Sequence, residues 1–268
     1  MSMSRNRSFA LAALVCLCAA PLAAQDVTPN FGATVPGAWV TDRYAPTTFA
    51  ITNATHGRNG VLNIGITSAG DFFSRPGGYQ YTFYNTQGEQ TTLSAAPGSY
   101  SLTADLWVDG TWASNLENNS RRTDMWGVAV DGSHNAWDYP IVGFSNYSGA
   151  GLFRGYDVNT GVWHDFSNPV NYDAWNTLGL SWNSTSNLYS YFVNGSLAGT
   201  VQGDGVAVGI GAMIMQAYNF NDPSLANGST DYTAQWSNTP TVPEPASMAL
   251  VATGLLGLGF LARRRRKA

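Results

Sequence analysis

Cysteine is almost missing from this 268-residue chain. The two cysteines, Cys16 and Cys18, lie in an apolar run near the N-terminus, so residues 25–242 hold none. Without a thiol, that span cannot form a disulfide, use a cysteine nucleophile or bind a metal through thiolates. The chemistry of the central part must therefore rest on other side chains.

Positive charge is also scarce in the central part of the chain. Residues 25–242 contain no lysine and six arginines against 16 acidic residues, a net charge of −10. A nucleic-acid-binding protein needs a basic footprint, so we expect no nucleic-acid partner. The same balance disfavours bulk attraction to an anionic polysaccharide, and it leaves room for a bound cation.

Sequence patterns of common catalytic and metal sites are missing as well. The histidines His56, His134 and His164 have neither His-x-His nor His-Glu-x-x-His spacing, which argues against a zinc site. No Gly-x-Ser-x-Gly elbow of a serine hydrolase occurs. These absences turn attention to the two ends of the chain and to its strand pattern.

The N-terminus has the parts of a secretory signal peptide. Arg5 and Arg7 precede an apolar run over 9–20, and small residues lead to a cleavage site after Ala24. A run of 12 residues is too short to span a bilayer. The alternative, a lipoprotein signal using Cys16 or Cys18, is disfavoured because both lie inside the run.

The C-terminus has three parts in a fixed order. Pro243-Glu244-Pro245 precedes 17 uncharged residues, 246–262. As a helix of about 1.5 Å per residue, this run is roughly 25 Å long and just spans a bilayer. The cations that follow keep their end of the span in the cytoplasm. They are Arg263, Arg264, Arg265, Arg266 and Lys267.

This order of Val-Pro-Glu-Pro, apolar span and arginine cluster resembles the PEP-CTERM sorting domain of Gram-negative bacteria over 242–268. The resemblance implies that an exosortase-type membrane protease recognises the tail and releases or transfers the protein. The plain alternative is a single-span anchor. We expect an exported protein of the cell envelope or extracellular space, held in the inner membrane transiently or stably with a cytoplasmic C-terminus.

The central part has the composition and periodicity of an all-β domain. Glycine, asparagine, serine and threonine are frequent, and no long amphipathic helix pattern appears there. The expected strands are 47–52, 61–67, 79–84, 99–108, 125–130, 140–145, 150–156, 161–166, 175–183, 187–194, 196–202, 206–216 and 230–236. The expected segments are a signal peptide 1–24, an irregular lead-in 25–46, a β-sandwich 47–238, a linker 239–245, a transmembrane helix 246–262 and a basic tail 263–268.

Residues 175–202 predict a meander of three antiparallel strands. Leu178, Leu180 and Trp182 share one face of the first strand, and Asn194-Gly195 favours a type I′ hairpin turn. The run Trp-Asn-Thr-Leu-Gly-Leu-Ser-Trp, a polar turn, then Tyr-Phe-Val-Asn-Gly resembles the late strands of laminin-G/concanavalin-like jelly rolls. The resemblance implies an antiparallel two-sheet β-sandwich whose concave face and rim loops bind sugars in many relatives.

Related jelly rolls include β-glucanases, whose catalytic strand reads Glu-x-Asp-x-Glu. The nearest equivalent here has the spacing, with Asp105 and Asp109 at the ends and Trp107 at the centre. A retaining pair of carboxyls must lie about 5 Å apart, whereas residues four apart on a strand have Cα atoms roughly 13 Å apart. We therefore expect that the protein is not an enzyme.

Three loops, 109–124, 131–140 and 145–157, mix aromatic residues with asparagine and aspartate. Aromatic rings stack on sugar faces and the polar side chains bind hydroxyls. We place Trp107 and Trp126 in the core instead. The candidate glycan-binding residues are Trp112, Asn135, Trp137, Asp138, Tyr139 and Tyr147.

The leading hypothesis is a non-catalytic surface or matrix protein that contacts extracellular polysaccharide. Alternatives are a structural or adhesive matrix protein without a defined ligand and a degenerate or unrecognised glycan-active enzyme. A Ca²⁺ site is a further hypothesis, because oxygen ligands suit this ion. Its candidate acids are Asp124, Asp131, Asp138 and Asp157, and the alternative is that these acids are solvated. No other cofactor is expected.

Overall fold

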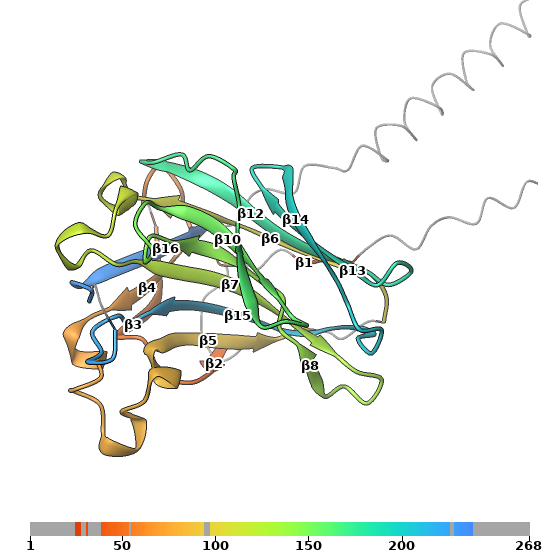
Figure 1. The fold of residues 1–268 in the computed structure, drawn as a ribbon, viewed down its shortest axis with the longest axis horizontal. Coiled ribbons are helices and arrows are strands. Elements are labelled where there is room, and N and C mark those ends of the chain that lie inside the picture. Colours follow the sequence, from red (N-terminus) through yellow and green to blue (C-terminus); the bar gives the residue numbers. More distant parts are fainter. Residues whose placement is uncertain are drawn as a thin grey trace, which may run out of the picture.

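The computed structural model describes residues 25–27, 31, 39–53, 55–93, 97–225 and 228–237. Within them, two eight-stranded sheets pack against each other (Figure 1). All strand pairs are antiparallel except the one that β1 (Gln25–Val27) makes with β6 (Tyr100–Val108). The structure confirms the expected all-β, antiparallel two-sheet β-sandwich.

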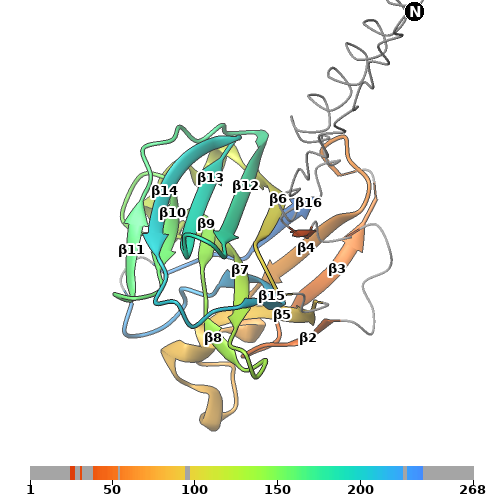
Figure 2. The ribbon, with the colours of Figure 1, turned by 90° about the vertical axis from the view of Figure 1, so that its right-hand side faces the viewer.

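The first sheet has the order β14-β13-β12-β6-β16-β4-β3, and Figure 2 shows β14, β13 and β12 side by side. Its remaining bounds are β3 (Thr48–Thr52), β4 (Val61–Ile66), β12 (Ala174–Asn183), β13 (Leu188–Val193), β14 (Ser196–Gln202) and β16 (Tyr232–Ser237).

The second sheet has the order β11-β10-β9-β7-β15-β5-β2, and β8 pairs with β7. Its bounds are β2 (Trp39–Thr41), β5 (Thr86–Thr92), β7 (Arg122–Val130), β8 (Ala136–Asp138), β9 (Ile141–Ser145), β10 (Leu152–Asp157), β11 (Val162–Asp165) and β15 (Gly209–Tyr218). Short 3-10 helices are Ser68–Gly70, Gly77–Tyr79, Thr82–Asn85, Gly110–Ala113 and Leu116–Asn118.

The core lies between the sheets and follows the two-residue period of the strands. Leu102, Ala104 and Leu106 of β6 are fully buried, as are Met213 and Met215 of β15 in the other sheet. Each large buried side chain contributes roughly 1.5–3 kcal/mol relative to an exposed one. The alternate residues of each strand therefore point away from the core, and on the second sheet they form the surface described below.

The predicted meander is confirmed. β12, β13 and β14 pair in sequence order, with Leu180 opposite Tyr191. Asn194 and Gly195 both have positive φ, 50° and 77°, as a type I′ turn requires. The alternation of apolar residues was sufficient here because this sheet buries one face of each strand.

The expected strand over 79–84 is wrong. Two 3-10 helices occupy this region, and Tyr79 N donates to Pro76 O at 2.7 Å while Tyr84 N donates to Tyr81 O at 3.0 Å. Its alternating aromatics face solvent, so they are not paired in a sheet. In Figure 1 this orange segment between β4 and β5 projects from the sandwich.

Strands in other places were not expected. β1 and β2 lie within 25–46, so that span is not wholly irregular as predicted. β5 has no apolar alternation, because its inward positions carry Gln87 and Glu89. Gln87 is fully buried and donates a hydrogen bond to Gly70 O at 2.5 Å. The position of β5 in the sheet is therefore fixed by its pairing with β15 and β2 rather than by an apolar face.

No helix among the described residues is long and apolar enough to cross a membrane. The expected signal peptide 1–24, the linker 239–245, the apolar run 246–262 and the basic tail 263–268 lie outside the described residues.

Candidate functional site

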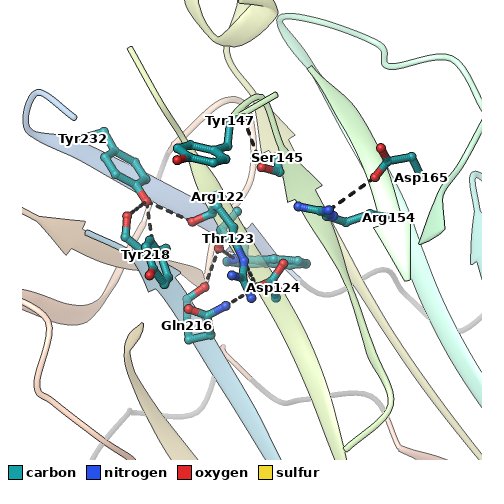
Figure 3. A network of polar contacts seen from close by, with 11 residues as sticks. Arg122, Thr123, Asp124, Ser145, Tyr147, Arg154, Asp165, Gln216, Tyr218 and Tyr232 are labelled. Atoms are coloured by element: carbon teal, nitrogen blue, oxygen red, sulfur yellow. Dashed lines mark hydrogen bonds and ion pairs between the residues drawn. The ribbon is translucent and has the colours of Figure 1, made fainter. Parts of the chain in front are cut away.

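A row of polar residues crosses five strands on the outer face of the second sheet. Gln216 of β15 pairs with Asp124 of β7, and Asp124 pairs with Gly143 of β9. Arg154 of β10 then lies between Gly143 and Asp165 of β11. Figure 3 shows Gln216, Asp124, Arg154 and Asp165 together with Arg122.

An aromatic and aliphatic row lies beside the polar row. Trp126 pairs with Ile214 on one side and Ile141 on the other, and together with Val128 these residues form a small buried cluster of their own. Tyr156 and Trp163 pack against it, with their ring centroids 5.2 Å apart. Both rings are half-buried, so part of each aromatic surface remains open to solvent.

The aromatic row and the arginines in and beside the polar row line a groove. A cavity of about 250 Å³ is bordered by Arg43, Arg122, Tyr139 and the aromatic row. A second cavity of about 130 Å³ is bordered by Arg122, Arg154 and Tyr147, among others. Because the side chain of Arg122 borders both, we treat them as one surface, which we call the groove.

The groove arginines lie against aromatic rings. The Cζ atoms of Arg122 and Arg154 are each 4.6 Å from the centroid of the Trp163 ring. Arg43 Cζ lies 4.6 Å from the centroid of Trp126. Cation–π contacts of this kind hold a guanidinium in place while its edge can still donate hydrogen bonds.

Asp124 is the buried partner of Arg122, which borders both cavities. Its side chain is fully buried, and it accepts hydrogen bonds from Arg122 Nε at 2.8 Å and from Gln216 Nε2. Gly143 provides the space, because a Cβ there would lie 2.1 Å from Asp124 Oδ1. Burial raises the pKa of the Asp124 carboxyl, and the neighbouring Arg122 opposes that shift.

The other two arginines have weaker acidic partners. Arg154 Nη2 lies 3.4 Å from Asp165 Oδ1, and Arg43 Nε lies 3.7 Å from Asp42 Oδ2. Burial lowers the pKa of Arg43 and of Arg154, and the charge of Arg122 lowers the pKa of each further. The guanidinium of Arg122 is thus close enough to repel those of Arg43 and Arg154.

Two of the predicted glycan-binding residues are buried, so those predictions are wrong. Trp112 is 5% exposed and packs against the rings of Phe144 and Tyr232. Its turn-rich sequence forms a 3-10 helix that folds back onto the end of the core. Asp138 is also buried, where it accepts a hydrogen bond from the Tyr189 hydroxyl at 2.8 Å.

The remaining candidates are divided between two places. Tyr139 and Tyr147 border the groove. Asn135 and Trp137 lie on the β7–β8 hairpin, where Asn135 Nδ2 donates to Asp131 at 3.3 Å and Trp137 Nε1 donates to Asp204 at 2.7 Å. Neither borders the cavities of the groove.

The placement of Trp107 in the core is wrong, and that of Trp126 needs correction. Trp107 is half-buried on the outer face of the first sheet, where the His56 ring stacks on it at 3.7 Å. Trp126 is buried, but beneath Arg43 on the outer face of the second sheet. Alternation within one strand shows which residues share a face, but it does not show which face points inward.

The four acids of the calcium hypothesis do not converge. Asp131 and Asp157 accept hydrogen bonds from backbone N–H groups of their own turns, while Asp124 and Asp138 are buried against the partners given above. In the part of the chain that the structure describes, no three acidic, histidine or cysteine side chains are grouped to hold a metal.

Asp105 and Asp109 each have partners of their own within the fold. Asp105 is buried on the outer face of the first sheet, where it contacts Arg58 and accepts a hydrogen bond from Thr177 Oγ1 at 2.6 Å. It is fully buried and lies on the sheet opposite the groove. Asp109 caps the 3-10 helix by accepting from Thr111 N at 2.8 Å.

Sequence reasoning missed the residues that define the groove, namely Arg43, Arg122, Arg154, Tyr156 and Trp163. The available signal was a period of two in charged and aromatic residues, Arg122-x-Asp124-x-Trp126 followed by Arg154-x-Tyr156. A strand that places arginine and aspartate on one face beside tryptophan is unusual for a plain solvated surface.

No curated protein matches the chain. Among solved structures, a sialidase is similar with a TM-score of 0.43 and 10% identity, over 75% of this chain and 16% of the sialidase. A GlcNAcα1-4Gal-releasing endo-β-galactosidase from Clostridium perfringens has a TM-score of 0.48 and 9% identity, over 78% of this chain and 59% of its own. A Bacillus licheniformis β-glucanase has a TM-score of 0.40 and 15% identity, over 80% of this chain and 96% of the β-glucanase.

This chain thus spans only part of the sialidase and of the endo-β-galactosidase. Likenesses at these identities and TM-scores carry no argument about its activity.

The C-terminal resemblance is confirmed. Residues 241–266 match the PEP-CTERM protein-sorting motif, a range that includes Pro243, Glu244, Pro245 and the four terminal arginines and ends before Lys267. This motif implies processing by exosortase, a membrane enzyme. The chain therefore carries a PEP-CTERM sorting motif and is an exported, envelope-associated protein.

Proposed function

We propose that the protein is a non-catalytic surface or matrix protein that contacts extracellular polysaccharide through the groove. The observation that carries the proposal is the position of Trp163, a half-buried ring with the guanidiniums of Arg122 and Arg154 each 4.6 Å from its centroid. A sugar ring can stack on the open aromatic surface while guanidinium N–H groups bind its oxygens.

The absence of catalysis is part of the same proposal. The two carboxyls of the polar row both face arginine, Asp124 with Arg122 and Asp165 with Arg154. Asp124 is also fully buried beneath the groove, out of hydrogen-bond reach of a bound glycosidic oxygen. This arrangement supports binding over hydrolysis, which needs an accessible acid and a second carboxylate across the bond.

The test is a glycan array with the purified protein and two matched variants. Trp163→Ala should weaken binding of recognised glycans about tenfold or more, since one stacked aromatic ring is worth roughly 1–3 kcal/mol. Trp137→Ala removes an exposed ring outside the groove and should leave the profile unchanged. A protein that binds no glycan, or one that turns a glycan over, would contradict the proposal.

A second candidate function is adhesion without a defined ligand. One observation favours it: the segment between β4 and β5 exposes several large aromatic side chains, with Phe73 63%, Tyr81 63% and Phe83 57% exposed. Exposed apolar patches commonly mark contact surfaces. If this candidate is correct, replacing Phe73 and Tyr81 by serine should reduce attachment of the protein to cell surfaces while leaving glycan binding unchanged; Phe83 is kept because Arg43 of the groove lies over its ring.

For the sorted tail, we propose the finer arrangement that the sequence suggests. Residues 246–262 hold the protein in the inner membrane before or without cleavage, and the basic tail stays in the cytoplasm. The PEP-CTERM match supports this arrangement through its association with a membrane enzyme.

A further inference from the structure

We propose that the groove selects acidic polysaccharides, whose sugar rings carry carboxylates, over neutral ones. This inference rests on the proposed function, because it names the class of glycan that the same groove would bind.

The first observation is where the arginines lie. The span 25–242 has only six arginines and no lysine, and three of them border the groove, namely Arg43, Arg122 and Arg154. The net charge of this span is strongly negative, so the groove carries a large share of its cations. Bulk attraction to a polyanion is disfavoured, but a local contact with this cluster is not.

The second observation is that the guanidiniums keep donors available. In the described part of the chain, Arg122 makes its side-chain hydrogen bond through Nε alone, to Asp124. Arg154 Nε is buried and has no hydrogen-bond partner among the described residues. Since a ligand cannot reach a buried atom, the donors that Arg154 offers are its terminal Nη groups, on a side chain that is 16% exposed and whose Nη2 lies 3.4 Å from Asp165 Oδ1.

The third observation is the balance of charge around these donors. The guanidiniums of Arg122 and Arg154 both lie over the Trp163 ring, although their like charges repel. Of the acids beside the arginines, Asp42 and Asp124 have carboxyl pKa values that burial raises and that the neighbouring Arg43 and Arg122, respectively, lower. Asp165, whose side chain is 50% exposed, lies on the edge strand. A ligand carboxylate would relieve the repulsion between the guanidiniums.

The chemistry of the two rows then identifies the ligand class. A planar guanidinium matches a carboxylate through two parallel N–H···O bonds, which a neutral hydroxymethyl group cannot form. An aromatic ring binds the face of a sugar. A uronic acid offers both features on one ring, so a chain of uronic acids fits both rows of the groove.

The test compares polygalacturonate oligosaccharides with the same oligosaccharides in fully methyl-esterified form. These ligands share backbone and linkage and differ in charge. Binding of the purified protein is measured by calorimetry at about 0.15 M salt with a chelator present, where charges beyond about 8 Å are screened. We expect the acidic form to bind about tenfold or more tightly, because hydrogen bonds between charged groups are the stronger ones.

Variants then assign the preference to the groove. Arg154→Gln should remove most of the preference, and Arg154→Lys, which keeps the charge and loses the planar fork, should retain part of it. Arg58→Gln is the matched control, because Arg58 pairs with Asp105 on the opposite sheet. Circular dichroism and a melting curve confirm that each variant is folded, and the comparison of the two ligands on the unaltered protein does not depend on any variant.

The outcomes separate this inference from the proposed function. Equal affinity for both forms, or binding only of neutral glycans on the array, overturns the acidic preference and leaves the glycan-binding function standing. A preference that persists in Arg154→Gln and falls in Arg58→Gln overturns its assignment to the groove. Failure to bind any glycan overturns the proposed function itself.

Discussion

Arg122 and Asp124 lie two residues apart on β7 and face the same side of the sheet, where Arg122 Nε donates a hydrogen bond to Asp124 Oδ2 over 2.8 Å. Asp124 is fully buried, whereas the Arg122 side chain is 16% exposed at the groove. The buried carboxylate therefore fixes the position of a cation that a ligand can reach.

Replacing Asp124 by asparagine should destabilise the protein by about 2 kcal/mol, because Arg122 loses its buried counter-charge. For a domain of this size the melting midpoint should fall by about 4–8 °C. Asp231→Asn, at an exposed position, is the control and should change the midpoint little. An unchanged midpoint in Asp124→Asn would show that the pair contributes nothing to stability.

Gly143→Ala tests the close packing over Asp124. Its Cβ would lie 2.1 Å from Asp124 Oδ1 and 2.4 Å from Thr123 O, so the strand or the carboxylate must move. We expect a loss of about 2–3 kcal/mol in urea unfolding. Gly132→Ala is the matched control, since nothing lies within 4 Å of its Cβ position. Equal stability of the two variants would mean that Gly143 is not tightly packed against Asp124.

The corrected position of Trp112 gives a direct mutational comparison. Trp112→Ala removes a buried ring and should cost about 3–5 kcal/mol, whereas Trp137→Ala removes a ring that is 46% exposed and should cost less than about 1 kcal/mol. Chemical denaturation of both variants measures the difference. A larger loss of stability in Trp137→Ala than in Trp112→Ala would show that Trp112 is a surface residue.

Burial raises the pKa of Asp138 above its ordinary value of 3.8, against the hydrogen bond from Tyr189. The folded state therefore binds this proton more tightly than the unfolded state, so the contribution to stability is present at low pH and is lost as the pH rises above 3.8. Asp138→Asn cannot ionise. The free energy of unfolding of the variant, minus that of the wild type, should rise with pH across this window.

Asp131→Asn provides a control of opposite sign. A hydrogen bond from the backbone N–H of Asn135 lowers the pKa of Asp131 below 3.8. The side chain of Asn135 and the backbone N–H of Ser133 lower it further by smaller amounts. The contribution of Asp131 to stability is lost as the pH falls through the range below 3.8. The free energy of unfolding of the variant, minus that of the wild type, should therefore fall as the pH rises across that range. Slopes of the same sign in the two variants would contradict the assignment of both shifts.

The sorting motif makes a prediction about location. Truncation after Val242 removes the PEP motif, the apolar run and the basic cluster together, so the protein should become soluble in the periplasm or the medium. Cell fractionation and immunoblotting measure this. A truncated protein that still fractionates with the inner membrane would show that another part of the chain anchors it.

The meander could be predicted from the sequence because its signals are local. The two-residue alternation of Leu178, Leu180 and Trp182 and the Asn194-Gly195 turn act within one short segment. β5 could not be predicted in the same way, since Gln87 on its inward face gains its partner, Gly70, only in the folded chain. Burial of a polar strand depends on contacts that no local pattern contains.

The groove could not be predicted either, because its parts come together only when β7, β10, β11 and the segment after β2 are placed in one sheet. The search for binding residues favoured loops, whereas Arg122, Arg154 and Trp163 lie within strands. Trp112 was predicted as a binding residue but is buried, because the turn-rich segment around it folds over the core. Chain position alone shows neither the inward face of a strand nor the direction of a loop.

The most direct measurement is a crystal structure of the protein with an oligosaccharide that it binds on the array. We expect a sugar ring stacked on Trp163, with its polar groups contacting the guanidiniums of Arg122 and Arg154. An oligosaccharide bound at Trp137 on the β7–β8 hairpin, or anywhere else with the groove left empty, would contradict the assignment of function to this surface.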